Sequence, residues 1–170
     1  MQRFLIFFLC IFCFSNLHAQ DSNIGFTIKN LGINVDGHFN TFTIIANFDA
    51  NGRLNTITST IEVSSIETGI DSRDEHILGE DYFHMEKYAT ITLKSTEVKT
   101  LKANSYQLKA NLTIKGKTKQ IKIPVKVQKI NDTYKITSYF EINRKDFDVG
   151  GGSFVMSKTV KINVLHYQNL

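Results

Sequence analysis

Histidines and acids lie close together in one segment of this 170-residue chain. His76 and His84 flank Glu80 and Asp81, and a spacing of eight places two side chains on one helix face, because two turns take about 7.2 residues. Neutral imidazoles and carboxylates are ligands of zinc sites. The segment has no HExxH-like pattern, however, and histidines are common on polar helix surfaces. We therefore predict no metal site here.

Other residue types that could support catalysis also lack the necessary context. Neither Ser64 nor Ser65 lies in a nucleophile elbow, and no motif places a histidine to activate either hydroxyl. The acids show no spacing or motif typical of glycoside hydrolysis. The glycines of 150–152 are not followed by the Lys-Ser/Thr pair of a phosphate-binding loop. We therefore predict no catalytic residues and a protein that is not an enzyme.

The N-terminal 19 residues have the organisation of a secretory signal peptide. Arg3 gives a positive start, an unbroken apolar run follows over 4–14, and a short polar stretch ends at Ala19. The apolar run has 11 residues, whereas a membrane span needs about 20. We therefore predict a signal peptide over 1–19, cleaved before Gln20, and a periplasmic or secreted protein.

Residues 20–170 are predicted to form one domain without cysteine, because Cys10 and Cys13 both lie in the predicted signal peptide. Disulfides, thiolate metal sites and cysteine nucleophiles are thereby excluded from this domain. A domain of this length buries roughly 68–70% of the surface of its unfolded chain, which is enough for stability without cross-links.

Charge is distributed unevenly along the chain. Residues 20–93 contain 4 basic and 11 acidic side chains, whereas residues 94–145 contain 13 basic and 3 acidic ones. The basic half is expected to be mainly a solvated face with edge lysines that deter aggregation. Contact of this half with an anionic membrane or an anionic ligand head group stays open. No nucleic-acid partner is expected, since the predicted export and the lack of a stacking motif argue against one.

Apolar residues alternate with polar ones along most of the chain, which indicates half-buried antiparallel strands. The alternating segments are 24–28, 42–48, 57–63, 91–93, 106–114, 121–127, 134–142 and 160–164. Turn sequences separate several of them, at 51–52, 115–117 and 131–132. About eight sequential strands with tight turns fit an up-and-down barrel better than a sandwich. The predicted fold class is therefore all-β, an eight-stranded antiparallel barrel.

One segment breaks the alternation and predicts a short helical insertion. Ser72 and Glu75 have the spacing of a capping box, with Ser72 as the N-cap and Glu75 as its reciprocal partner. Three apolar residues then follow at helical spacing: Leu78, Tyr82 and Met85. We predict a helix over 73–86 that is loosened at Gly79.

Six pieces of sequence, in order, are similar to one known family: 24–32; 35–42 with 48–49; 64–68 with 73–76; 81–83 with 86–88 and 91–92; 112–119; and 142–147. They resemble the YceI-like family, bacterial periplasmic proteins with a lipocalin-like barrel. The resemblance covers nearly all of residues 20–170. Four positions depart from the family pattern: Asn30 replaces a usual His, Ala89 a Pro, Glu67 an Asp and Asp148 a Gly. A role of the missing His cannot be transferred to this chain.

The resemblance implies a lipocalin-like barrel, with a helix over one region, that holds a long amphiphile such as a polyisoprenoid quinone or polyprenyl chain. Each buried methylene contributes about 0.8 kcal/mol, so such a ligand needs few polar contacts. The apolar residues available to line a tunnel are Phe26, Ile28, Phe42, Ile44, Ile61, Ile91, Leu93, Leu108, Leu112, Phe140 and Ile142. The alternative is that these side chains fill a solid core.

The family pattern also includes two pairs of charged residues, Arg73 with Asp74 and Arg144 with Asp146. We expect them to be structural, forming a capped helix and a charged network that closes one end of the barrel. A clamp for a ligand head group at the tunnel mouth is the functional alternative.

The resemblance thus favours an exported soluble protein that sequesters, stores or transports an isoprenoid or similar lipid, with no cofactor other than that lipid. Three alternatives stay open: a solid-core barrel that acts as an interaction module, a small enzyme acting on an amphiphile, and a small outer-membrane barrel. The enzyme would need an inward-facing acid–base pair, which the strand pattern does not show. Homodimer formation also stays open.

Overall fold

The structure, a computed structural model, describes residues 22–170. The predicted signal peptide and both cysteines lie outside these residues. The strands are β1 (Asn23–Asn30), β2 (Ile33–Phe39), β3 (Phe42–Phe48), β4 (Leu54–Glu62), β5 (Ile66–Glu67), β6 (Thr90–Lys102), β7 (Ser105–Ile114), β8 (Lys117–Ile130), β9 (Thr133–Asn143) and β10 (Met156–Asn169). The helix α1 spans Asp71–Leu78, and the 3-10 turns η1 and η2 span Val63–Ser65 and Arg144–Phe147.

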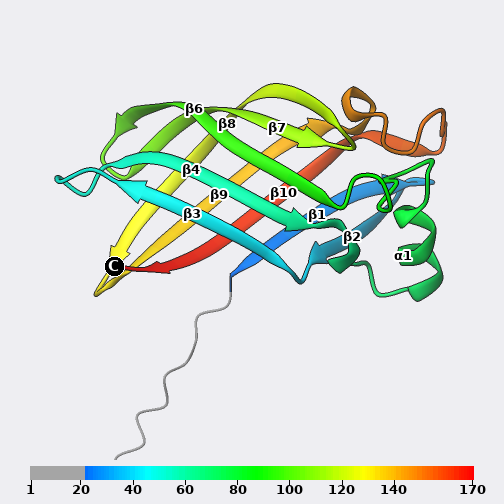
Figure 1. The fold of residues 1–170 in the computed structure, drawn as a ribbon, viewed down its shortest axis with the longest axis horizontal. Helices are drawn as coiled ribbons and strands as arrows, with labels where there is room; N and C mark the ends of the chain where they lie inside the picture. The colour runs from blue at the N-terminus through cyan, green and yellow to red at the C-terminus, as the bar shows by residue number, and fades with distance from the viewer. Residues whose placement is uncertain (1–21) are drawn as a thin grey trace, which may run out of the picture.

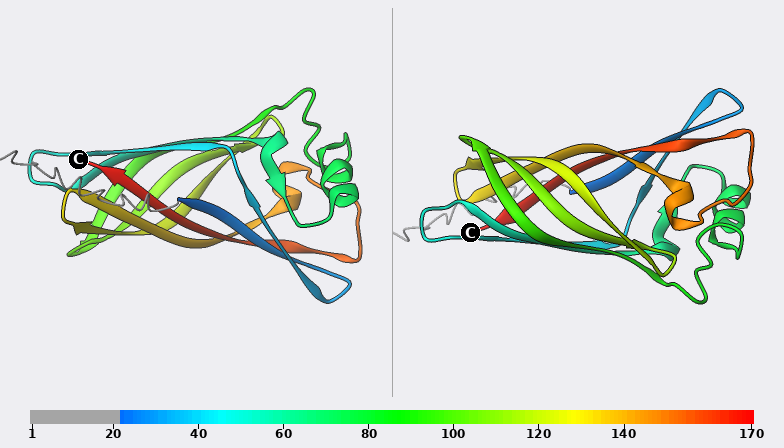
Figure 2. Two further views of the ribbon diagram at one scale, coloured as in Figure 1. Left: turned by 90° about the horizontal axis from the view of Figure 1, so that it is seen from below. Right: turned by 90° about the horizontal axis from the view of Figure 1, so that it is seen from above.

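Within residues 22–170, the strands form one ten-stranded antiparallel sheet in the order β3-β4-β6-β7-β8-β9-β10-β1-β2-β5. The sheet curls into a half-barrel, with α1 and the β9–β10 connection at one end and the β3–β4 turn and the C-terminus at the other (Figures 1 and 2). The all-β, antiparallel prediction with a short helix is confirmed.

The predicted count of eight strands is wrong because two strands leave little trace in the sequence. β2 contains Asp36 and Gly37, residue types that are depleted in strands and that interrupt its alternation. β5 has two residues, which is too short to show a period. The long hairpins are clearer, because alternation and turn chemistry agree. Lys115 and Gly116 both adopt positive φ, at 48° and 71°, as the tight turn between β7 and β8 requires.

The helix differs from its prediction at both ends. It begins at Asp71 after the N-cap Ile70, and no side chain caps it, so the capping box of Ser72 and Glu75 is not formed. It ends at Leu78, and the chain continues to residue 88 in turns. Of the three apolar residues that suggested a longer helix, Leu78 packs on the core from α1 and Met85 does so from these turns. Tyr82 instead lines a cavity beside α1.

Two clusters of buried apolar residues form the core inside the curled sheet. The first includes Leu54, Leu108 and Tyr134 and belongs to the end with the β3–β4 turn. The second includes Val63 and Phe147 and extends to the α1 end. Three partly buried residues pack against both clusters: Ile44, Leu93 and Ile121. The core is therefore continuous along the long axis.

No helix in the described residues is long and apolar enough to cross a membrane.

Candidate functional site

Two apolar cavities lie inside the curled sheet formed by residues 22–170. The first has about 130 Å³ of free space and is lined by β1–β4 and β6–β10, with many aliphatic side chains among them. The second has about 230 Å³ and lies nearer α1, where β1, β2, α1 and η2 contribute to its walls. For comparison, a cavity of about 150 Å³ can accept a benzene-sized ligand.

The two cavities adjoin each other along the barrel axis. They share five lining residues, which we call the shared belt: Phe39, Ile91, Ile114, Ile142 and Ile162. These side chains come from β2, β6, β7, β9 and β10, so the belt encircles much of the interior. The belt therefore lies between two neighbouring apolar cavities, and the interior is not uniformly filled.

Most of the residues predicted to line a tunnel border one of the cavities. Those on the first are Ile44, Ile61, Leu93, Leu108, Leu112 and Phe140. Phe26 and Ile28 border the second cavity, and Ile91 and Ile142 border both. Phe42 borders neither cavity and packs against the second apolar cluster.

The sequence interpretation missed several lining residues that strand phase would have identified. Ile114 continues the inward phase of Leu112, and Ile162 and Val164 lie in phase on β10. Ser138 and His166 share the inward phase of their strands but are polar, so hydrophobicity alone did not select them. Ser59 on β4 also borders the first cavity.

Two residues that line the first cavity each carry a buried polar atom that has no hydrogen-bond partner within residues 22–170. They are Ser59 Oγ and His166 Nε2. Ser59 stands opposite Ile44 in the β3–β4 register, and the His166 ring lies near the Ile44 backbone. Both atoms therefore belong to the same side of the cavity.

The other ring nitrogen of His166 is held in place. His166 Nδ1 lies 2.9 Å from Ser22 Oγ, which accepts a hydrogen bond from the Tyr167 amide. A hydroxyl that accepts from Tyr167 can donate its proton to Nδ1, which favours the tautomer with its proton on Nε2. Burial lowers the pKa of His166, against smaller opposing effects of the Gln168 side chain and the Ile44 backbone. Burial thus favours the neutral form of the ring.

Arg144 borders the second cavity and has a structural role there. Its side chain is buried, and its guanidinium donates to four backbone carbonyls: Ser157 (2.9 Å), Val149 (2.7 Å), Ser153 (3.2 Å) and Met156 (3.1 Å). Desolvation by burial lowers its pKa, although an arginine stays charged. These contacts fix the β9–β10 connection against the cavity wall.

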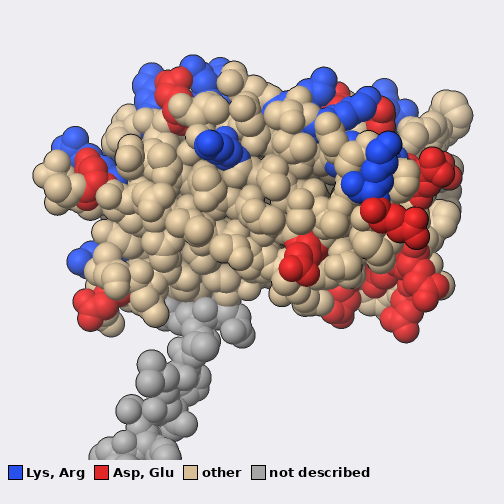
Figure 3. Space-filling model, in the orientation of Figure 1, with Lys and Arg blue, Asp and Glu red and all other residues tan. Residues whose placement is uncertain are grey.

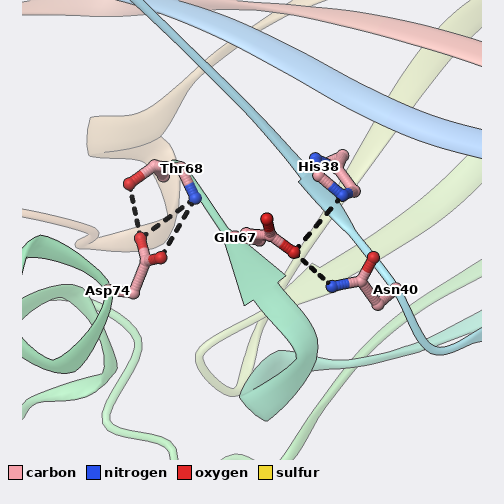
Figure 4. Close-up of polar contacts among 5 residues, drawn as sticks. All are labelled: His38, Asn40, Glu67, Thr68 and Asp74. Carbon is pink, nitrogen blue, oxygen red and sulfur yellow. Dashed lines mark hydrogen bonds and ion pairs between the residues drawn. The ribbon is translucent and has the colours of Figure 1, made fainter. Parts of the chain in front are cut away.

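Arg73 and Asp74 instead converge on Thr68. Arg73 donates to Thr68 Oγ1 at 2.7 Å and to the Thr68 carbonyl at 2.6 Å. Asp74 accepts from the Thr68 amide at 3.1 Å and from its hydroxyl (Figure 4). Asp146 is exposed and makes no side-chain hydrogen bond or ion pair within the described chain. The expected charged network of these residues is therefore not formed: Arg73 and Asp74 meet at Thr68, whereas Arg144 binds backbone carbonyls of the β9–β10 connection.

A second polar contact attaches β5 to β2 beside Thr68. Asn40 donates to Glu67 Oε2 at 2.8 Å, and His38 Nε2 lies 3.7 Å from the same oxygen (Figure 4). Neither this contact nor the contacts of Arg73 and Asp74 with Thr68 bring together a set of metal ligands. No group of three or more His, Cys, Asp or Glu side chains suited to a metal ion occurs in residues 22–170.

A YceI-like domain model matches residues 16–166, which is most of the chain. The chain belongs to the YceI-like family. UPF0312 proteins of Photorhabdus laumondii and Pseudomonas aeruginosa are 35% and 36% identical to it. These matches cover 62% and 64% of this chain but 56% and 58% of the relatives, so the chain spans less than two thirds of their length.

Solved structures share the fold of this chain. The crystal structure of Burkholderia cenocepacia BcnA is 25% identical, with a TM-score of 0.82 over 87% of this chain and 96% of that one. A polyisoprenoid-binding domain from Saccharophagus degradans, implicated in plant cell wall breakdown, is 18% identical, with a TM-score of 0.70 over 88% of this chain and 94% of that one. The second likeness shows a shared fold.

Proposed function

We propose that this YceI-like protein binds one long isoprenoid or similar amphiphilic lipid along its interior, and that it sequesters, stores or transports that lipid without chemical change. The observation that carries the proposal is the pair of adjoining apolar cavities that share a belt of five residues. A flexible hydrocarbon chain can pass such a belt, because aliphatic side chains can shift between rotamers at little cost. The polyisoprenoid-binding domain of the same fold supports this choice of ligand.

The two unpartnered polar atoms further restrict the proposed ligand. A pure hydrocarbon would leave Ser59 Oγ and His166 Nε2 buried without hydrogen bonds, at a cost of about 1–3 kcal/mol each. Both atoms are covered by the surrounding side chains, so a hydroxyl or carbonyl oxygen on the lipid would form hydrogen bonds with them after a rotamer change of the lining. We therefore propose an amphiphile, such as an isoprenoid alcohol or quinone, with its polar group in the first cavity.

The proposal also includes the cellular location. The organisation of residues 1–19 supports export to the periplasm or the exterior, where a soluble carrier would shield an apolar chain from water. Amino-terminal sequencing of the exported protein would test this part, and a mature chain beginning at Gln20 is the expected result.

The test of lipid binding is to purify the protein without detergent, extract it with organic solvent and analyse the extract by mass spectrometry. We expect about one prenyl lipid per protein. Ile142→Phe adds volume at the shared belt and should lose most of this lipid. Phe42→Trp adds volume at a residue that borders neither cavity and should keep it.

A clean extract would contradict the proposal if the folded wild-type protein also failed to take up an added polyprenol or quinone. In that case the interior would act as a solid core, and the protein would be better explained as an interaction module. Equal lipid content in Ile142→Phe and Phe42→Trp would place the lipid outside the cavities.

A further inference from the structure

Four large apolar side chains are exposed together beside the second cavity. Leu31 and Ile33 lie in and after the β1–β2 turn and are each 71% exposed. Phe154 and Val155 precede β10 and are 100% and 53% exposed. We call these four residues the apolar tip. Exposed apolar clusters of this kind are typical of surfaces that bind another body.

The two segments of the apolar tip are joined to each other. The Leu31 amide donates to the Val155 carbonyl at 2.9 Å, and Asn30 pairs with Met156 in the adjoining register. Figure 2 shows the β1–β2 turn and the β9–β10 connection side by side in both views, at the end of the barrel that carries α1. The tip is therefore one surface built from two segments that are distant in sequence.

Three lysines lie beside the Phe154 and Val155 segment of this surface. Lys29, Lys145 and Lys158 line a shallow groove together with Phe154 and Val155. None of the three lysines forms an ion pair within residues 22–170. The acids of α1 gather at the same end of the molecule but over a different region of it (Figure 3). An anionic surface would thus attract the tip and repel the α1 side, which would fix the orientation of contact.

We propose that the apolar tip inserts into the head-group region of a bilayer that contains anionic lipids, with Lys29, Lys145 and Lys158 binding the lipid head groups. Apolar side chains at the interface combined with lysines nearby are the two components of peripheral membrane binding. The surface adjoins the second cavity, because Asn30 and Met156 border that cavity and flank the tip. Docking would therefore bring the proposed lipid-binding interior close to a lipid source.

This inference concerns a surface other than the basic half of the sequence. Of the three lysines only Lys145 belongs to residues 94–145, and most lysines of that half lie on the hairpin strands. The two surfaces can therefore be tested against each other. Lys119, Lys122 and Lys126 on β8 are exposed and supply a matched set of three charges.

The experiment is co-sedimentation of the purified protein with vesicles of phosphatidylcholine, with or without phosphatidylglycerol. We expect binding that requires phosphatidylglycerol and weakens with salt. Phe154→Glu should reduce binding by roughly tenfold or more, because it removes a large inserted side chain and adds a negative charge. Leu101→Glu is the matched control: Leu101 is 57% exposed and is the second-last residue of β6, a strand that ends away from α1 (Figure 1).

A charge test distinguishes the two basic surfaces. The triple change of Lys29, Lys145 and Lys158 to Glu should abolish vesicle binding, whereas the same change of Lys119, Lys122 and Lys126 should leave most of it. The reverse result would overturn the proposal and assign the contact to the basic half. Equal unfolding midpoints for all variants would show that each one is folded.

Other results would also overturn the inference. If the wild-type protein bound neither vesicle but formed a dimer that Phe154→Glu disrupted, the tip would be an interface with a second copy. If Phe154→Glu bound vesicles as well as the wild type does, the tip would have no part in docking. The solvent extract of Phe154→Glu should keep its lipid, so failure of docking and failure of lipid binding give different readouts.

Discussion

Arg144 shows how one buried charge can organise a loop. Its relative exposure is 3%, and its five N–H donors meet four carbonyls from Val149 to Ser157. Several carbonyls converge here because the chain must turn back from η2 into β10. The planar guanidinium can reach all of them, which a lysine ammonium with three donors cannot do.

We expect Arg144→Met to lower the free energy of unfolding by about 3 kcal/mol, because it leaves buried carbonyls without donors. Arg144→Lys should recover a minor part of this loss. Urea unfolding followed by circular dichroism measures both. Asp146→Asn is the control and should change the stability by less than about 0.5 kcal/mol, since Asp146 is exposed. Equal losses of unfolding free energy in Arg144→Met and Asp146→Asn would indicate that the two residues act in one charged network.

His166 gives the protein a pH-dependent stability whose sign can be derived. Burial lowers its pKa in the folded state, so the unfolded chain takes up a proton at this ring more readily. Stability is therefore lost as the pH falls from about 6.5, the ordinary value for histidine, toward the lower folded-state pKa. Above that window the ring is neutral in both states, and its contribution is constant.

We expect His166→Phe to flatten this part of the pH profile of unfolding, by at most about 1.4 kcal/mol per pH unit. The measurement is urea unfolding from about pH 5 to about pH 8, across the range in which histidine titrates. His76→Gln is the control, because His76 is an exposed residue of α1. If the profiles of wild type and His166→Phe ran parallel, His166 would not be the group that titrates.

At the scale of the element, β2 has a sequence unlike that of a typical strand. Its packing nevertheless leaves no room for a side chain at Gly37. Gly37 faces inward between Val35 and Phe39, and a Cβ there would collide with the Phe26 ring and lie 2.9 Å from the Glu67 carbonyl. The missing side chain lets β1, β2 and β5 approach closely. That approach places Phe26 on the second cavity.

We expect Gly37→Ala to destabilise the fold by about 1–3 kcal/mol, because Phe26 must leave its position and the Glu67 backbone cannot yield freely. Gly25→Ala on the neighbouring strand is the matched control. Its Cβ would meet its nearest atom at 3.6 Å, an ordinary contact, so we expect little or no loss. Thermal unfolding of both variants measures the difference, and a loss as large in Gly25→Ala would exclude the steric explanation.

The elements also show what could be predicted from the sequence. The β7–β8 hairpin was predictable because its alternation and its Lys115-Gly116 turn indicate the same structure independently. The start of α1 was not, because the partner of Asp74 is Thr68, which precedes the helix. Most of the cavity lining followed from strand phase, but the polar members Ser59 and His166 were missed because selection by hydrophobicity passes over polar residues in the inward phase.

At the scale of the whole molecule, a curled sheet must protect its outermost strands. β3 is one edge of the sheet, and the end of β10 approaches it without a strand ladder. The Gln168 side chain bridges this gap, since it accepts from the Ala46 amide at 2.9 Å and donates to the Ala46 carbonyl at 2.8 Å. A side-chain amide thus replaces a pair of backbone hydrogen bonds and covers part of an exposed edge.

Gln168 therefore determines whether the interior stays closed between β3 and β10. We expect Gln168→Leu to cost about 1–2 kcal/mol, because Ala46 is 2% exposed and would lose both partners. The Ala46 amide should exchange with solvent faster, and bound lipid should be released faster, while Asn169→Ala, which removes an exposed contact with Thr133, changes neither rate. Gln168→Glu retains the acceptor for the Ala46 amide but sets an oxygen against the Ala46 carbonyl, so its effects should be intermediate. If the Ala46 amide exchanged equally slowly in all of these variants, β3 would be held by apolar packing alone, and lipid would have to enter and leave elsewhere.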